Sequence, residues 1–440
     1  PVANTTFFAV VFGDMQATGT PSDGTVLPVS IATGLDFTFN SVSVGKGANS
    51  VSGNTVLGEN ALDDSVSGGN NVAIGKAALG ALTSGAQNVA IGGLCLDAVT
   101  TATYNTGIGY AAGSALTTGA FNTILGGNAL TTAVGANNNV AVGYNSMNVT
   151  TSGFENVAVG FAALDANTSG STNVAVGNNA LTASTTASNN TAVGNAALGA
   201  NTTGTQNTAV GADALDSNTT GSFNVAVGHD ALQANITGTY NVGIGQTALG
   251  ANTGTGNTAI GGGALEANTS SGNNTAVGHN ALADNTTGGG TAVGSFSLYV
   301  STTGTANTAV GHNSLGSNTT ASNNTAVGDY ALQANTTGAD NVAIGSAALD
   351  SNTTASNNTA IGRLALQANT TGGTNTAVGS LCLDANTTGN DNTAMGVAAL
   401  GKNTTASNNA AFGRAALAEN TSGGGNVAVG ANALDANTTG

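Results

Sequence analysis

The sequence contains no tryptophan, three prolines and two cysteines among its 440 residues, and only 6% of the residues are charged. So few charges cannot give soluble helices a charged outer face or supply the flanking charges of a coiled coil, so helix is not expected. The cysteines, Cys95 and Cys382, are too few and too far apart for a disulfide framework or a zinc site. We expect both to be buried thiols that replace a small apolar side chain.

Basic residues are scarce: the chain has 5 against 21 acidic residues, and its formal net charge is −16. A surface of this sign repels phosphate backbones and anionic lipids, so we expect no nucleic-acid partner. The longest apolar run near the start, residues 7–12, is far too short to span a membrane, and no basic residues precede it. We therefore expect no membrane insertion and no secretion signal.

Recognisable catalytic motifs are also missing. Nothing resembles a phosphate-binding loop, a nucleophile beside a base, or a pair of carboxylates set in a cleft. A uniform repeat also offers no concave pocket. We therefore expect the chain not to be an enzyme and to use no cofactor and no metal.

Glycine is abundant, with 67 residues, and much of it belongs to a tandem repeat. From Asn54 to Gly440 the same 17-residue unit returns, with the consensus N-[T/V]-A-[V/I]-G-x-x-A-L-x-x-N-T-T-G-x-x. The glycine at its fifth position recurs 23 times, from Gly58 to Gly430, and two of the intervals are one residue short. Such self-similarity is typical of solenoids, in which each unit is stabilised by stacking on its neighbours.

The pattern inside one repeat predicts β structure. Val72 and Ile74 fall on one side of an extended strand and Ala73 on the other, so one side faces a core. We expect a second short strand at Ala78-Leu79, with turns between the two strands. The predicted fold is all-β: a parallel β-solenoid (β-roll) of about 23 seventeen-residue coils, on the order of 110 Å long at ~4.8 Å per coil.

Several positions of the repeat form continuous rows along the stack. The fourth strand residue is always apolar, and a near-invariant leucine follows the glycine, which gives two apolar ladders. The third strand residue and the residue before the leucine are small, which predicts a tight packing seam, either inside each coil or between subunits. The asparagine that opens the strand predicts an Asn ladder. Because one coil encloses only a thin core, we expect a homotrimer.

The strand motif in 71–75 and 173–177 resembles the head repeats of trimeric autotransporter adhesins, which build a trimer of left-handed parallel β-rolls. The longer pattern in 207–221, with its Ala-Leu and Asn-Thr-Thr-Gly segments, is closer to the repeat arrays of bacteriophage fibre and virion-appendage proteins. The resemblance covers roughly residues 54 to 440. It implies a structural fibre on the virion surface.

Residues 1–53 differ from the repeats, since they hold all three prolines and five of the 11 phenylalanines. Leu35, Phe37 and Phe39 alternate on one face of a predicted strand, whereas Val42 and Val44 fall on the other. This switch predicts a bend or bulge near Asn40-Ser41. We expect residues 1–53 to be a small β-rich module that caps the shaft of residues 54–440 and attaches it to a virion protein.

Four aromatic residues just before the opening asparagine are the candidate surface contacts: Tyr104, Phe121, Phe223 and Tyr240. Regularly placed rings can stack on the sugars of a host-surface glycan, seal a subunit interface or pack locally. His229, His279 and His312 follow the strand-ending glycine, where we expect ordinary turn residues. Because neighbouring histidines are two or three coils apart, they cannot share a metal within one chain.

An acidic stripe follows the conserved leucine, for which we expect a solvated face, with weak calcium binding as the alternative. Its members are Asp63, Asp97, Asp165, Asp216, Asp350, Asp384 and Asp435.

The leading hypothesis is a structural fibre of a phage virion that projects a trimeric rod for contact with a host surface. The alternative is a bacterial cell-surface adhesin or an extracellular matrix filament. Ice binding by a threonine ladder is disfavoured, because Thr219 and Thr220 are adjacent and point to opposite sides.

Overall fold

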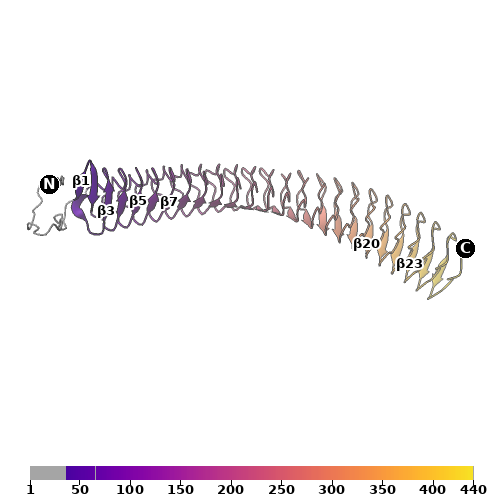
Figure 1. The fold of residues 1–440 in the computed structure, drawn as a ribbon. Helices are drawn as coiled ribbons and strands as arrows, with labels where there is room; N and C mark the ends of the chain where they lie inside the picture. The colour runs from indigo at the N-terminus through magenta and orange to yellow at the C-terminus, as the bar shows by residue number, and fades with distance from the viewer. Residues whose placement is uncertain (1–35, 65, 440) are drawn as a thin grey trace, which may run out of the picture. The chain divides into compact units, whose positions relative to one another are not determined.

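The computed structural model describes residues 36–64 and 66–439, in two compact units that meet in sequence between Asn138 and Asn139. Apart from one 3₁₀ turn, η1 (Ala48–Ser50), the regular elements of these residues are all strands. In Figure 1 the strands of each unit lie side by side as arrows, one in every coil.

The strands of the first unit are β1 (Phe37–Phe39), β2 (Val42–Gly45), β3 (Thr55–Gly58), β4 (Val72–Ile74), β5 (Val89–Ile91), β6 (Thr106–Ile108) and β7 (Thr123–Leu125). Those of the second are β8 (Val140–Val142), β9 (Val157–Val159), β10 (Val174–Val176), β11 (Thr191–Val193), β12 (Thr208–Val210), β13 (Val225–Val227), β14 (Val242–Ile244), β15 (Thr258–Ile260), β16 (Thr275–Val277), β17 (Gly290–Val293), β18 (Asn307–Val310), β19 (Thr325–Val327), β20 (Val342–Ile344), β21 (Thr359–Ile361), β22 (Thr376–Val378), β23 (Thr393–Met395), β24 (Ala410–Phe412) and β25 (Val427–Val429).

Within each unit every repeat strand pairs in parallel with its copy in the next repeat, in register. Ala73 lies opposite Ala90 in the first unit, and Ala175 opposite Ala192 in the second. The two short repeats keep this register because the missing residue falls in a turn; Val242 still pairs with Thr258. The predicted parallel β-solenoid with a 17-residue repeat is confirmed.

The core of each coil is narrow and consists of small side chains facing leucines. The third residue of the repeat, counted from the opening asparagine, points inward, and Ala73 and its copies are fully buried. Ala78 and Leu79 are also fully buried. The packing seam predicted from the rows of small residues therefore lies inside each coil, which was one of the two alternatives.

The predicted second strand at Ala78-Leu79 is wrong, since this segment is a series of turns. Leu79 has φ of 52° and Ala77 of 56°, far from extended geometry. In a strand adjacent side chains point to opposite faces, so only a turning backbone can bury both Ala78 and Leu79. The segment still links the coils, because Leu79 N–H donates to the carbonyl of Cys95 at 3.1 Å.

The glycine that ends each strand is required by its backbone and by its neighbours. Gly75 has φ of +129°, and a Cβ there would lie 2.5 Å from the carbonyl oxygen of Gly92 in the next coil. An L-residue would be strained and would also clash with backbone atoms. This double constraint explains why the fifth position of the repeat does not vary.

Two asparagine ladders form hydrogen bonds along the interior of the coils. In the predicted ladder, the Asn71 backbone N–H donates to Oδ1 of Asn54 at 2.8 Å, and the Asn71 side chain donates to the carbonyl of Gly85. A second ladder is formed by the asparagine of the Asn-Thr-Thr-Gly segment: Asn218 Nδ2 donates to Oδ1 of Asn201 at 2.8 Å. The first prediction is confirmed, and the second ladder is an addition to it.

The predicted bend near Asn40-Ser41 is confirmed as a two-residue hairpin turn between β1 and β2, which pair antiparallel. Asn40 and Ser41 have φ of 50° and 65°, as a type I′ turn requires. Strand β2 then pairs antiparallel with β3, the first strand of the parallel stack. The proposed attachment role rests largely on residues 1–35, which lie outside the described residues.

Candidate functional site

The outward side chains of the repeat strands form a surface that we call the strand face. It comprises the second and fourth residues of each repeat, counted from the opening asparagine, in the coils of β3–β25; Thr208 and Val210, for example, flank the inward Ala209. The second residue is threonine in 13 strands, valine in nine and alanine in one, and the fourth is always apolar. No charged residue occurs in either row, so in both units the strand face is an uncharged surface rich in β-branched side chains.

The fourth-position ladder is on the outside rather than in the core. Its residues are half-buried or exposed, with Met395 at 43% and Phe412 at 38% exposed. The reason is the width of the coil: the leucine on the far side fills most of the interior, so a small residue, usually alanine, occupies the inner face of the strand. The larger Val and Ile side chains must point outward.

The four candidate aromatic residues form two stacked pairs on neighbouring coils. Tyr104 and Phe121 stack at 5.1 Å between ring centroids in the first unit, and Phe223 and Tyr240 at 4.9 Å in the second. All four are exposed, Tyr240 most of all at 64%. Each ring covers one face of its partner, so the residues pack on each other while remaining accessible from outside.

A further aromatic cluster lies in the turns that follow the strands. Ring edges link His279 to Phe296, Phe296 to His312, and His312 to Tyr330, over four consecutive coils of the second unit. The histidines were expected to be ordinary turn residues, and both are exposed. The sequence analysis did not link these histidines to the aromatic residues. Each histidine lies about one repeat from an aromatic residue, and this spacing predicts contact between neighbouring coils.

The acidic stripe is only partly solvated. Burial raises the pKa of five of its carboxyl groups above the usual range: Asp97, Asp165, Asp216, Asp350 and Asp384. Asp63 and Asp435 are exposed. The prediction of a solvated face therefore holds for these two, whereas the other five are half-buried between neighbouring coils.

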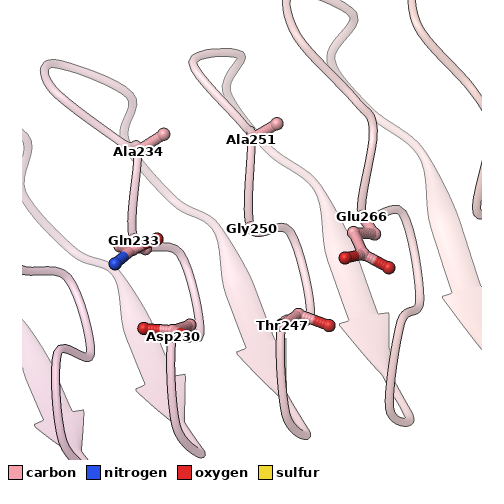
Figure 2. A pocket seen from close by; sticks show the side chains of 7 residues that line it. All are labelled: Asp230, Gln233, Ala234, Thr247, Gly250, Ala251 and Glu266. Carbon is pink, nitrogen blue, oxygen red and sulfur yellow. The ribbon is translucent and has the colours of Figure 1, made fainter.

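An open hollow interrupts the same row in the second unit (Figure 2). Gly250 has no side chain to fill the space between Gln233 and Glu266, and Asp230 and Thr247 border the hollow on one side. The hollow is thus a gap beside a glycine of this row, with carboxylates at two of its edges.

Both cysteines are fully buried, as predicted. Burial raises the pKa of the Cys95 thiol, and likewise that of Cys382, to about 12. A buried protonated thiol is a poor nucleophile and a poor metal ligand. Cys95 and Cys382 therefore act as small core side chains.

Compared with known proteins, the sequence matches no protein-family model and no curated protein. The likeness to phage and adhesin repeats thus remains a resemblance of sequence pattern. Within residues 36–64 and 66–439 there is no helix of the length and apolarity needed to cross a membrane.

Proposed function

We propose that the chain is a structural fibre or appendage protein of a phage virion, located on the virion surface, in which three copies associate through their strand faces. Residues 1–53 attach the shaft to a virion protein, and the turns contact the host surface. The observation that supports association is the strand face, which is uncharged and partly exposed in a chain of net charge −16.

The chemistry of the strand face favours a second copy of this chain as its partner. The acidic residues all lie off this face, so two copies can bring their faces together without opposing charges. Over the 18 strands β8–β25, a strip about 10 Å wide amounts to roughly 800 Å² per copy, which is what each partner of a stable complex contributes. The choice of three copies follows the resemblance and the thin core.

Sedimentation velocity of the full chain tests the assembly. We expect a single species with three times the chain mass, and a monomer across the accessible concentrations would contradict the proposal. A dimer would keep the strand face as the interface but overturn the threefold arrangement.

Charged substitutions locate the interface. Ile361→Lys with Val378→Lys places two ammonium groups on neighbouring strands of the strand face, which should convert the trimer to monomer because buried unpaired charges are costly. The matched control is Ser346→Lys with Ser380→Lys, in the slot after the strand-ending glycine, where Arg363 already sits. Dissociation by both pairs alike would show that charge in general, and not this face, disrupts the assembly.

Immunogold electron microscopy of native source material, with antibody to residues 1–53, tests the location. Gold at the base of projections on capsids or tails is the expected result. Labelling of cell envelopes or free filaments, with virions bare, would instead favour the adhesin or matrix-filament alternative.

Ice binding becomes a second candidate because of the strand face itself. The argument against it considered Thr219 and Thr220, which are adjacent, whereas Thr208 and Val210 are two apart and share one flat outward face. A thermal-hysteresis measurement on the full chain distinguishes the two uses of the face. Activity that increases in the monomeric Ile361→Lys, Val378→Lys variant would indicate that assembly covers an ice-binding face, whereas no activity in either protein would remove ice binding.

A further inference from the structure

Two carboxylates and an imidazole converge in consecutive coils of the second unit. Asp213 and Asp230 occupy the same slot, two residues after the strand-ending glycine, one repeat apart, and His229 precedes Asp230. One ligand atom from each of the three side chains lies within 4.8 Å of the other two. His229 Nδ1 is 2.8 Å from Oδ2 of Asp230.

The solenoid backbone holds these side chains in place. Asp213 N–H donates to the carbonyl of Asn195 at 3.0 Å, and Asp230 N–H donates to that of Ala212 at 3.2 Å. Both aspartates have nearly the same positive φ, 56° and 57°. The repeat therefore aligns the two carboxylates on one side of the stack, next to an exposed imidazole.

No lysine or arginine of the described residues forms an ion pair with either carboxylate. The ion pairs of lysine in the structure are Lys76 with Glu59 and Lys402 with Glu419. The imidazole of His229 is thus the ion-pair partner of Asp230, and two carboxylates this close, with no lysine or arginine beside them, favour a bound cation.

We propose that Asp213, His229 and Asp230 bind one divalent metal ion of the zinc class. Zn²⁺ accepts imidazole nitrogen together with carboxylate oxygen, and three protein ligands leave a further position for water or an external ligand. Ca²⁺ prefers six to eight oxygen ligands, so the imidazole argues against it. Asp230 also borders the hollow beside Gly250, so a ligand on the open position has space next to the site.

The chain contains its own matched control. His312 Nδ1 lies 3.2 Å from Oδ1 of Asp329, so it has a carboxylate neighbour like that of His229. Relative to His312, the positions that correspond to Asp213 and Asp230 hold Phe296 and Asn313. His312 therefore has one carboxylate neighbour, whereas His229 has two. The proposal predicts metal binding at the first histidine and not at the second.

Isothermal titration of the metal-stripped full chain with Zn²⁺, and separately with Ca²⁺, tests the site. We expect one Zn²⁺ site per chain, and Co²⁺ in its place should give visible absorption bands typical of low coordination. His229→Gln and Asp213→Asn should each weaken Zn²⁺ binding by more than the roughly 10- to 100-fold that loss of an outer-shell partner costs. His312→Gln should leave the affinity unchanged.

Three results would overturn the proposal: no saturable Zn²⁺ binding, equal weakening by His312→Gln and His229→Gln, or Ca²⁺ binding as tightly as Zn²⁺ and independently of His229. Circular dichroism of each variant shows that the coils remain folded, which is expected because the His229 and His312 side chains are exposed in turns. Sedimentation of the same samples reports assembly separately, so failure of the metal site leaves the fibre proposal untouched.

Discussion

The interior of the coils and the strand face are both built from continuous apolar rows, yet their sequences vary in different ways. Inside, the third strand residue departs from alanine in only four strands, and two of these departures are matched by a change in a contacting residue. A Cβ at Gly107 would lie 2.7 Å from Sγ of Cys95, the larger residue that replaces alanine there. The residues of the inner row are thus determined by the volume available inside the coil.

The residues of the strand face are determined instead by polarity. Its fourth position accepts valine, isoleucine, leucine, methionine and phenylalanine, but never a charged residue. A surface that tolerates changes of shape but excludes charge is expected where a partner covers it after folding. The difference teaches that folding of one coil constrains the inner row, whereas the composition of the outer row agrees with the proposed assembly.

The largest expected effect comes from breaking a matched pair inside the first unit. Gly113 stands where all other coils but one have leucine, and the buried Ile124 fills the space, with Cδ1 2.8 Å from where a Cβ of residue 113 would lie. Ile124→Ala should lower the free energy of unfolding by about 2–5 kcal/mol, and Gly113→Leu by about 1–3 kcal/mol. The double variant should recover most of the loss, since it restores the common repeat.

Chemical denaturation of the four proteins measures this coupling. Additive losses in the double variant would show that the two positions are independent. A control on the strand face, Leu125→Val, should change stability by less than about 0.5 kcal/mol, because its side chain is 45% exposed.

The next effect concerns the polar ladder of the interior. Asn335 donates to Oδ1 of Asn318 and to the carbonyl of Gly338, and accepts from Asn352. Asn335→Ala should cost about 1–3 kcal/mol, because it leaves buried polar atoms without partners. The exposed Asn195, in a slot where Ala212 also occurs, is the control, and its alanine variant should be close to neutral by thermal denaturation. Equal destabilisation by both would mean that asparagine acts through the turn conformation rather than the ladder.

The period, the strand and the first asparagine ladder were predictable because they depend on local pattern and repetition alone. Alternation showed that Val72 and Ile74 share a side, but it could not show that this side faces outward, since both sides are apolar. That depends on Leu79, which fills the interior from the opposite wall. Ala78 and Leu79 are adjacent and both apolar, whereas a strand would point their side chains to opposite faces. This pattern already argued against a second strand.

The sites on the turns were less predictable. Tyr104 and Phe121 occupy the same position in consecutive repeats, so the repeat length alone predicts that their rings stack. Asp213, His229 and Asp230 occupy two different slots, and their convergence depends on backbone turns with positive φ that the pattern does not specify. Sequence reasoning compared histidines only with one another and so missed the aspartates.

Stacked aromatic rings on the outer turns should matter more for binding than for folding. Phe223→Ala with Tyr240→Ala removes one pair and should lower stability by no more than about 0.5–1.5 kcal/mol. If the pair stacks on host glycans, retention on host cells falls while the sedimentation coefficient is unchanged. The control is Tyr144→Ala with Phe161→Ala, a stacked pair from the other turn. Loss of assembly with the first pair would identify subunit packing as its role.

The smallest effect is expected at Asp350, which follows the buried Leu349 and is half-buried between neighbouring coils. Burial raises the pKa of Asp350 in the folded chain above the value of 3.8 that applies when it is exposed. A raised folded pKa means that the neutral form favours folding: this contribution is complete below pH 3.8 and is lost as the pH rises through the folded pKa. Asp350→Asn should therefore stabilise the chain at pH 7 and have little effect near pH 3.5.

Denaturation curves at several pH values between about 3.5 and 7 provide the measurement. The exposed Asp63 serves as the control for loss of a surface carboxylate, and Asp63→Asn should change stability at pH 7 by less than about 0.5 kcal/mol. A stabilisation by Asp350→Asn that persists unchanged at low pH would assign the effect to hydrogen bonding by the amide, not to the cost of burying a charge. The half-buried position of Asp350 would then resemble the asparagine ladders of the interior, in which hydrogen bonding by the side-chain amide stabilises the stack.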